Sequence, residues 1–248
     1  MQELLKPIKS ESLKEICVAR FEELILSGKL AIGQKLPSER ELASQLGVSR
    51  PVVHEGLVDL AAKGLVSLKP RVGTVVNDFR KEGSLSLLTS LVNYHQGRLD
   101  AGLLNSLLEM RMLFEVETAR LAALKRGEQH LLVFDKILED QKLVDFDQVQ
   151  KITELDFDFH HLIAVATGNH IYPLLLNSFK QFYCNLAGQF FSDPDVVEAV
   201  FQFHSKMVGA IRRKDAVEAA TIMKDMLTHG EVHLKRMIEQ DHQGMEDE

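Results

Sequence analysis

Residues 35–76 constrain the fold of this chain more than any other stretch, because they carry helix start and stop signals in a fixed order. Ser38 precedes an acidic turn and is typical of a helix N-cap, and Gly47 suits the left-handed backbone at a helix end. Ser49 and Pro51 then begin a second helix. Its buried face is predicted from apolar residues at helical spacing: Val53, Leu57 and Leu60.

A small hairpin is predicted to follow the second helix. The β-prone runs 65–68 and 74–76 flank a basic turn at 69–73, and Gly64 ends the preceding helix. Two helices with a tight turn and a hairpin form a winged helix-turn-helix, which places the start of its second helix in a DNA major groove.

Basic and hydroxyl side chains gather where such a fold would meet DNA. Arginine bridges guanine edges, and serine and lysine hold phosphates. Two short amphipathic helices joined by a glycine also occur in domains that bind no DNA, so these side chains carry the prediction. The predicted contacts are Arg40, Ser49, Arg50, Lys69 and Arg71.

The same block resembles the winged-helix domain of the GntR family of bacterial transcription regulators. The resemblance rests on residues 36–43, 46–50, 60, 63–66 and 73–76. It implies DNA contacts from the positions named above and from Gly73 in the wing. The chain departs from the family pattern twice. His54 replaces the arginine of a usual Leu-Arg-Glu, which makes His54 a DNA contact here, and Arg71 replaces the first wing glycine.

Composition predicts a cytoplasmic protein of two domains. The length of 248 residues suits two domains, and Cys17 and Cys184 are predicted to be free thiols. No apolar run approaches membrane-spanning length, and the N-terminus lacks a signal-peptide pattern. The net charge of −7 is uneven: residues 1–78 hold 11 basic and 10 acidic side chains, and the rest hold 18 and 26. The acidic excess therefore lies outside the predicted DNA-binding domain.

The predicted fold is mainly α, with a winged helix-turn-helix at 1–78, a linker and linking helix at 79–99, and an all-helical effector-binding and dimerisation domain at 100–248. Asp100 is predicted to cap a helix that ends at Gly127. Five further helices are predicted at roughly 128–142, 147–166, 170–191, 195–213 and 215–240. Six or seven helices with short connections imply an antiparallel bundle that can hold a pocket.

Three residues in the predicted bundle have the chemistry of a metal site. Asp156 and His160 lie four residues apart and project from one helix face, and His204 lies on the next helix but one. A carboxylate and two imidazoles can bind a divalent transition metal. With 10 histidines in the chain, these two can equally be ordinary core or surface residues.

Residues 155–160 and 166–169 resemble the D-x-x-x-H…GN signature of the FCD effector domain, found in the FadR branch of the GntR family. The resemblance implies one divalent metal, zinc, nickel or manganese, held by Asp156, His160, His204 and a fourth ligand. The fourth position is Met226, a poor ligand for these metals, and His229 lies one turn later.

The FCD resemblance also implies that Arg111 faces an acidic effector. Glu115, one turn further along the same predicted helix, is the alternative partner for this arginine. The resemblance therefore predicts a small carboxylate effector, with Arg111, Met226, His229 and the metal around it.

A second resemblance, to the fatty-acid-responsive FadR regulators, rests on 168–172 and on Asn177, Lys180 and Tyr183. It implies a long-chain acyl-CoA effector and no metal, with Asn177 at the effector site. Four phenylalanines can line an acyl tunnel or simply fill the core: Phe179, Phe182, Phe190 and Phe191.

The preferred function is a homodimeric, ligand-responsive regulator that binds a palindromic DNA operator. Its effector is a small carboxylate, with acyl-CoA as the alternative. The competing class is a metal-dependent hydrolase centred on Asp156, His160 and His204. No glutamate stands in an H-E-x-x-H motif, and about 70 residues resemble a DNA-binding module, so we expect no enzyme activity.

Overall fold

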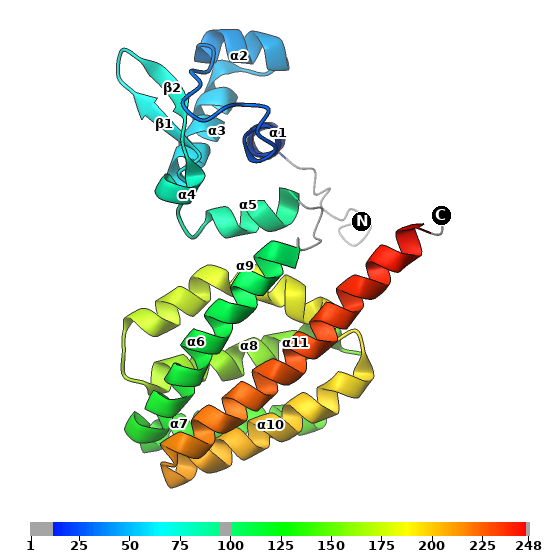
Figure 1. The fold of residues 1–248 in the computed structure, drawn as a ribbon. Helices are drawn as coiled ribbons and strands as arrows, with labels where there is room; N and C mark the ends of the chain where they lie inside the picture. The colour runs from blue at the N-terminus through cyan, green and yellow to red at the C-terminus, as the bar shows by residue number, and fades with distance from the viewer. Residues whose placement is uncertain (1–11, 95–100, 247–248) are drawn as a thin grey trace, which may run out of the picture. The chain divides into compact units, whose positions relative to one another are not determined.

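The computed structural model describes residues 12–94 and 101–246. The chain forms two compact units, Met1–Arg98 and Leu99–Glu248. Within the described residues there are eleven helices and one two-stranded sheet (Figure 1). The predicted fold class, mainly α with a small β wing, is confirmed. None of the helices in the described ranges is long and apolar enough to cross a membrane.

The first unit begins with three helices, α1 (Leu13–Leu26), α2 (Glu39–Leu46) and α3 (Arg50–Ala62). Ser12 and Glu15 form a capping box that starts α1, a helix that the sequence analysis did not assign. Ser38 and Glu41 do the same for α2, and Gly47 ends it with a φ of 66°. The predicted buried face of α3 is confirmed: Val53, Leu57 and Leu60 are at most 1% exposed.

The wing is an antiparallel pair of strands, β1 (Val66–Lys69) and β2 (Gly73–Val76). The register pairs Val66 with Val76 and Lys69 with Gly73, so the basic turn forms the tip. Thr74 and Val76 point into the core of the unit, which fixes the hairpin against α3.

The expected linker, 79–99, contains two helices, α4 (Phe79–Glu82) and α5 (Leu87–Tyr94). Leu87 and Leu91 of α5 pack against the apolar core of the first unit. The buried hydroxyl of Ser90 donates a hydrogen bond to Glu22 on α1, with an O–O distance of 2.7 Å. The described part of α5 therefore belongs to the first unit, and residues 95–99 lie outside the described ranges.

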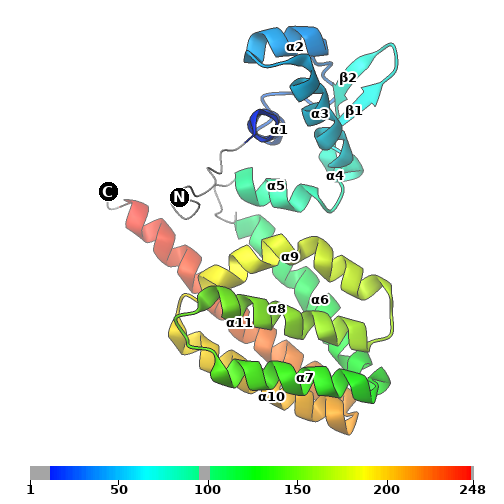
Figure 2. The ribbon, with the colours of Figure 1, turned by 180° about the vertical axis from the view of Figure 1, so that it is seen from behind.

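The second unit is a bundle whose described part contains six helices: α6 (Ala101–Lys125), α7 (Glu128–Leu143), α8 (Val149–Ala166), α9 (Ile171–Phe190), α10 (Pro194–Arg213) and α11 (Ala216–Glu246). Figure 1 shows α6 and α11 crossing side by side, and Figure 2 shows α8 between α7 and α9. The predicted cap Asp100 lies outside the described residues.

The bundle holds two separate apolar cores. The Phe134 core includes Ala119, Phe134, Ile163, Met207, Met226 and Leu227. The Phe191 core includes Leu108, Ile152, Phe190, Phe191, Val200 and Leu234. Four helices, α6, α8, α10 and α11, contribute to both cores. Three of them carry a buried polar residue in between: Glu115 on α6, Asp156 on α8 and His204 on α10. A layer of polar side chains therefore crosses the bundle.

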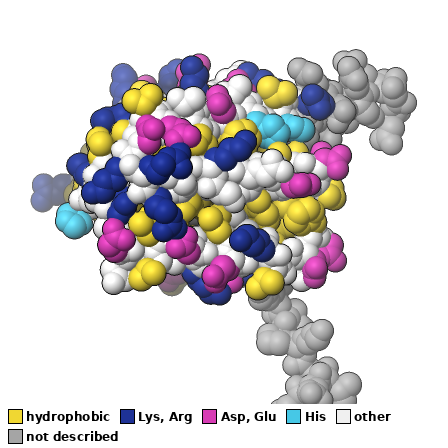
Figure 3. Space-filling view, turned by 90° about the horizontal axis from the view of Figure 1, so that it is seen from below, with side chains coloured by type: hydrophobic (Ala, Val, Ile, Leu, Met, Phe, Trp, Pro, Cys, Tyr) yellow, Lys and Arg dark blue, Asp and Glu magenta, His cyan; other side chains and the backbone are white. Residues whose placement is uncertain are grey.

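The surface of the bundle shown in Figure 3 intersperses basic, acidic and apolar side chains. Among the described residues on this face, no side-chain type forms a large continuous area.

Candidate functional site

The seven residues predicted to contact DNA are all exposed in the first unit. They lie on three neighbouring elements: Arg40 on α2, then Ser49, Arg50 and His54 at the start of α3, and Lys69, Arg71 and Gly73 on the wing. The turn at Gly47 and the antiparallel wing register present these donors to solvent. Winged-helix domains contact the bases of a DNA groove and the adjacent phosphates with exposed donors on these elements.

Glu39, which the sequence analysis did not single out, joins two of these residues. The Nε–H of Arg50 donates to Glu39 Oε2 at 3.1 Å, and Nδ1 of His54 lies 2.7 Å from Glu39 Oε1. The hydrogen bond with His54, with a smaller contribution from Arg50, lowers the pKa of Glu39. One carboxylate on α2 thus orients two groups on α3.

Arg71 adopts a φ of 64°, in the left-handed region that favours glycine. This is the position where the resemblance placed a glycine in the family. The wing tip therefore has a backbone angle that suits glycine but carries a cationic side chain.

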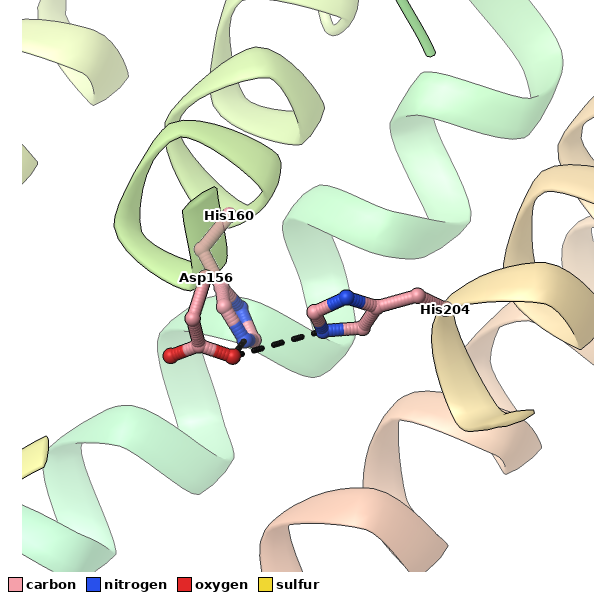
Figure 4. A group of neighbouring side chains, drawn as sticks. All are labelled: Asp156, His160 and His204. Carbon is pink, nitrogen blue, oxygen red and sulfur yellow. Dashed lines mark ion pairs between the residues drawn. The ribbon is translucent and has the colours of Figure 1, made fainter. Parts of the chain in front are cut away.

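In the second unit, Asp156 and His160 on α8 and His204 on α10 point toward one another (Figure 4). Asp156 Oδ1 lies 3.4 Å from Nε2 of His204 and 3.9 Å from Nε2 of His160. One ligand atom from each residue falls within 4.8 Å of the others, and all three side chains are buried. The predicted trio is therefore brought together.

The second nitrogen of each imidazole has its own neighbour. His160 Nδ1 lies 2.5 Å from Glu115 Oε2, and His204 Nδ1 lies 2.7 Å from the side-chain amide nitrogen of Gln141. Nε2 of His204 is buried and has no hydrogen-bond partner among the described residues. Metal-binding histidines donate one ring N–H to an outer acceptor and turn the other nitrogen to the ion, and His160 has such an acceptor in Glu115. The Gln141 amide nitrogen is a donor, so His204 takes this arrangement only with the Gln141 amide turned over, where Oε1, which has no hydrogen-bond partner among the described residues, accepts from Nδ1–H. The donor set of two nitrogens and one oxygen therefore fits zinc, nickel or manganese.

Ionisation in this cluster follows from burial and from neighbouring charges. Burial by itself raises the pKa of Glu115, but the charge of Arg111 and the contact with His160 outweigh it and bring the pKa to about 2. Burial also lowers the pKa of His204, which favours the neutral ring that metal ligation needs. Burial raises the pKa of Tyr183, so its hydroxyl stays protonated and donates to Asp156 Oδ2.

Arg111 lies beside this cluster. Its Nε–H donates to Glu115 Oε1 at 2.5 Å, and its guanidinium carbon lies 5.0 Å from the centre of the Tyr183 ring. The alternative partner considered for Arg111 in the sequence is thus in contact with it. We use the term polar layer for Arg111, Glu115, Gln141, Asp156, His160, Tyr183 and His204.

A cavity of about 520 Å³ opens beside the polar layer, between α6, α8, α9 and α11. Most of its wall is apolar, and Phe179, Phe190 and Phe191 contribute to it as the acyl-tunnel alternative supposed. The side chain of Phe182 lies outside the described part of the chain. The polar wall comes from Arg111, Glu115, Glu117, Asp156, His160, Tyr183 and Glu231.

Two predicted effector residues line the cavity and two do not. Arg111 and Met226 face it. Asn177 is exposed on α9, because Leu176 and Phe179 take the inward positions of that turn. The ring of His229 contacts the rings of Phe203 and His233, and His229 is not among the residues that line the cavity. The structure therefore does not bring Asn177 or His229 to the cavity wall, and His229 does not join the histidine cluster.

Both halves of the chain match families of known proteins. The profile of the gntR family of bacterial regulatory proteins matches residues 13–76, and that of the FadR C-terminal domain matches residues 77–242. The chain belongs to the GntR family, with a FadR-type C-terminal domain. It is therefore a DNA-binding transcriptional regulator and not an enzyme.

Similar GntR-family proteins come from several bacteria. The HTH-type transcriptional regulator Mce2R of Mycobacterium tuberculosis is 35% identical over 72% of this chain and 73% of its own length. The fatty acid metabolism regulator protein of Yersinia pestis is 29% identical over 81% of each chain. The solved structure of Lar, described as controlling the Listeria monocytogenes agr system, is 18% identical. It covers 92% of this chain and 99% of its own, with a TM-score of 0.64, and supports the fold alone.

Proposed function

We propose that this GntR-family regulator binds a palindromic operator as a homodimer and releases or engages it in response to a long-chain acyl ligand. The observation that carries the proposal is the cavity: its volume is about 520 Å³ and its wall is mainly Leu, Met and Phe. Pockets of this size hold ligands much larger than a small hydroxy or keto acid. We therefore favour the acyl alternative over the small carboxylate that the sequence led us to prefer.

The relatives support this choice. A protein named as a fatty acid metabolism regulator aligns with 81% of the chain, including most of the cavity-bearing unit. Burial of an alkyl chain contributes about 0.8 kcal/mol per CH₂ group, so an apolar cavity of this kind favours a long chain strongly.

DNA binding and ligand binding belong to different units, so the proposal includes communication between them. Two copies of the winged unit place their α3 helices about one DNA turn apart on a palindrome. The ligand shifts the balance between conformations with different operator affinity through residues 77–98, which join the units. A protein that reads chromosomal DNA in this way acts in the bacterial cytoplasm.

Gly230 offers a direct test of the cavity. It lies on α11 in the cavity wall, and a Cβ added there meets no atom within 4 Å. Gly230→Leu therefore adds apolar volume at the cavity wall from a Cβ that stands in open space, and it replaces a glycine inside a helix, which stabilises by about 1 kcal/mol. Val232→Leu, at an exposed position of the same helix, is the matched control.

The experiment follows operator binding by fluorescence anisotropy, with a duplex selected from random sequence. Palmitoyl-CoA is expected to change the operator affinity of the wild type and of Val232→Leu but not of Gly230→Leu. All three proteins are expected to bind DNA equally well without ligand. A response that persists in Gly230→Leu, or no response in the wild type, would contradict the proposal.

A metal-bound small carboxylate is the second candidate, because Asp156, His160 and His204 converge on one point. These three side chains would hold the ion, and a bound divalent ion would attract a carboxylate. Elemental analysis of purified protein and thermal shifts with zinc, nickel and manganese test this candidate. Stoichiometric metal that is lost in His204→Ala supports it. Metal-free protein with no thermal shift upon metal addition contradicts it.

A further inference from the structure

Arg50 and His54 lie one turn apart at the start of α3, and one carboxylate on α2 holds both. The Nε–H of Arg50 donates to Glu39 Oε2, and Nδ1 of His54 lies 2.7 Å from Glu39 Oε1. The Arg50 side chain is 71% exposed and that of His54 is 55% exposed, so both face solvent. The two side chains therefore share one anchor and keep their outer ends available for DNA.

The anchor determines which donors of Arg50 remain free. Its Nε–H is taken by Glu39, and the two terminal nitrogens, Nη1 and Nη2, have no hydrogen-bond partner among the described residues. Neighbouring N–H donors of this kind match O6 and N7 of guanine, which are both acceptors in the major groove. Arg50 therefore presents an end that suits guanine.

The same anchor determines which nitrogen of His54 carries hydrogen. The hydrogen bond with His54 lowers the pKa of Glu39, so the carboxylate is ionised and only accepts hydrogen bonds. The hydrogen between the two groups therefore belongs to Nδ1 of His54, a tautomer assigned from the hydrogen-bond network. A neutral imidazole carries hydrogen on one nitrogen alone, so Nε2 of His54 is left as an acceptor.

An acceptor at Nε2 selects among the groups that DNA presents. Phosphate oxygens, guanine O6 and N7, and thymine O4 are acceptors themselves and repel it. The major-groove donors are the exocyclic amines, N6 of adenine and N4 of cytosine. No described residue pairs with Nε2 of His54, so this nitrogen is free to accept from such an amine.

The spacing along α3 sets where the two bases lie. Positions 50 and 54 are about 6 Å apart along the helix axis, and successive base pairs of DNA are about 3.4 Å apart. The base that meets His54 is therefore about one to two base pairs from the base that meets Arg50.

We infer that Glu39 holds His54 as a hydrogen-bond acceptor, so that His54 selects an amino base, adenine or cytosine, about one to two base pairs from a guanine selected by Arg50. The inference rests on the proposed function and specifies the operator half-site. The arginine that the family pattern has in place of His54 carries donors alone, and it would select guanine instead.

Selection from random-sequence duplexes by the full-length protein tests the inference, at pH about 8, where imidazole side chains are ordinarily neutral. The wild type is expected to enrich a guanine with adenine or cytosine about one to two base pairs away. His54→Arg is expected to enrich guanine at that second position. Exchange of adenine for guanine, or of cytosine for thymine, at that position is expected to weaken wild-type binding about tenfold in anisotropy titrations.

Three variants assign each preference to its residue. His54→Ala is expected to lose the amino-base preference and to keep the guanine preference, and Arg50→Ala is expected to do the opposite. Glu39→Ala is expected to bring the tenfold ratio between amino-base and exchanged duplexes close to one, whereas a general loss of folding would lower both affinities and leave their ratio unchanged. His170→Ala changes an exposed histidine of the helical unit and is expected to keep both preferences.

The outcomes separate the inference from the proposed function. Guanine, thymine or no preferred base at the second position of the wild-type operator overturns the inference and leaves an operator-binding regulator in place. An amino-base preference that is unchanged in His54→Ala or in Glu39→Ala also overturns it. If the wild type enriches no sequence, the proposed operator binding fails, and the inference fails with it.

Discussion

The Nδ1 atom of His160 lies 2.5 Å from Oε2 of Glu115, and both side chains are buried in the middle of the bundle. The other oxygen of the same carboxylate accepts from Arg111. Glu115 is therefore the residue that connects the arginine of the cavity wall to the histidine of the Asp156 cluster. Its position between two apolar cores makes the polar layer a single connected unit.

The first prediction concerns the stability of this layer. Glu115→Ala leaves Arg111 buried without its partner, so we expect a loss of about 3–5 kcal/mol in the free energy of unfolding of the helical unit. Arg111→Met/Glu115→Met is expected to lose much less, because it removes both charges. Both losses are measured by urea unfolding, followed through the fluorescence of a tryptophan introduced as Leu132→Trp at an exposed position of α7. The chain has no tryptophan of its own, so this signal is unambiguous. Equal losses in the single and double variants would rule out the ion pair as the cause.

The second prediction concerns the wing tip. Arg71 has a φ of 64°, and the left-handed region costs a side-chain-bearing residue about 1–2 kcal/mol. Arg71→Gly is therefore expected to leave the winged unit about 1 kcal/mol more stable than Arg71→Ala. At Lys69, in β1, we expect the opposite order: Lys69→Gly should be less stable than Lys69→Ala, because glycine weakens a strand. A tryptophan at Val58 on α3 gives the unfolding signal. The same order at both positions would show that backbone strain at Arg71 plays no part.

The parts of this structure that could be predicted from the sequence are those set by local signals. Ser38 and Gly47 marked the ends of α2. The predicted breaks marked the ends of the bundle helices within a few residues, at Gly127, Asp145, Gly168, Pro194 and Lys214. The trio of Asp156, His160 and His204 was predictable because helical spacing placed two of its members on one face.

The missed features depend on contacts between distant positions. Gln141 meets His204 from 63 residues away, and nothing local to α7 marks that glutamine. Glu115 was noticed only as a neighbour of Arg111, while its second contact is with His160 on another helix. Asn177 directly follows Leu176 on α9. The turn of the helix from one residue to the next places Leu176 in the cavity wall and Asn177 on the surface.

The third prediction concerns DNA recognition. Arg50 is exposed at the start of α3, where a recognition helix meets base edges, so Arg50→Ala is expected to cost about 1–3 kcal/mol of specific binding and to relax sequence preference. Arg71→Ala is expected to weaken binding to all sequences similarly and to reduce the salt slope by about one unit. Anisotropy titrations over a range of salt with specific and scrambled duplexes measure both effects. Lys224→Ala, at an exposed position of the helical unit, is the control. Unchanged operator affinity in both arginine variants would exclude this face as the DNA interface.

The fourth prediction concerns the pH dependence of the contact between Glu39 and His54. The hydrogen bond with His54 lowers the pKa of Glu39, so the folded winged unit binds that proton less readily than the unfolded chain. The contribution to stability is therefore present above the unfolded-state pKa, about 4.3, and is lost as the pH falls through the lower pKa of the folded state.

At pH about 7, Glu39→Gln is expected to cost up to about 1 kcal/mol, since the carboxylate is partly exposed. As the pH falls below the lowered pKa of the folded state, Glu39 becomes protonated in both states and the difference should become small. Urea unfolding of the Val58→Trp background from neutral to low pH measures this. Glu55→Gln, an exposed carboxylate on α3, should change little across this range. A cost for Glu39→Gln that is as large at the low pH as at neutral pH would show that ionised Glu39 is not what stabilises the start of α3.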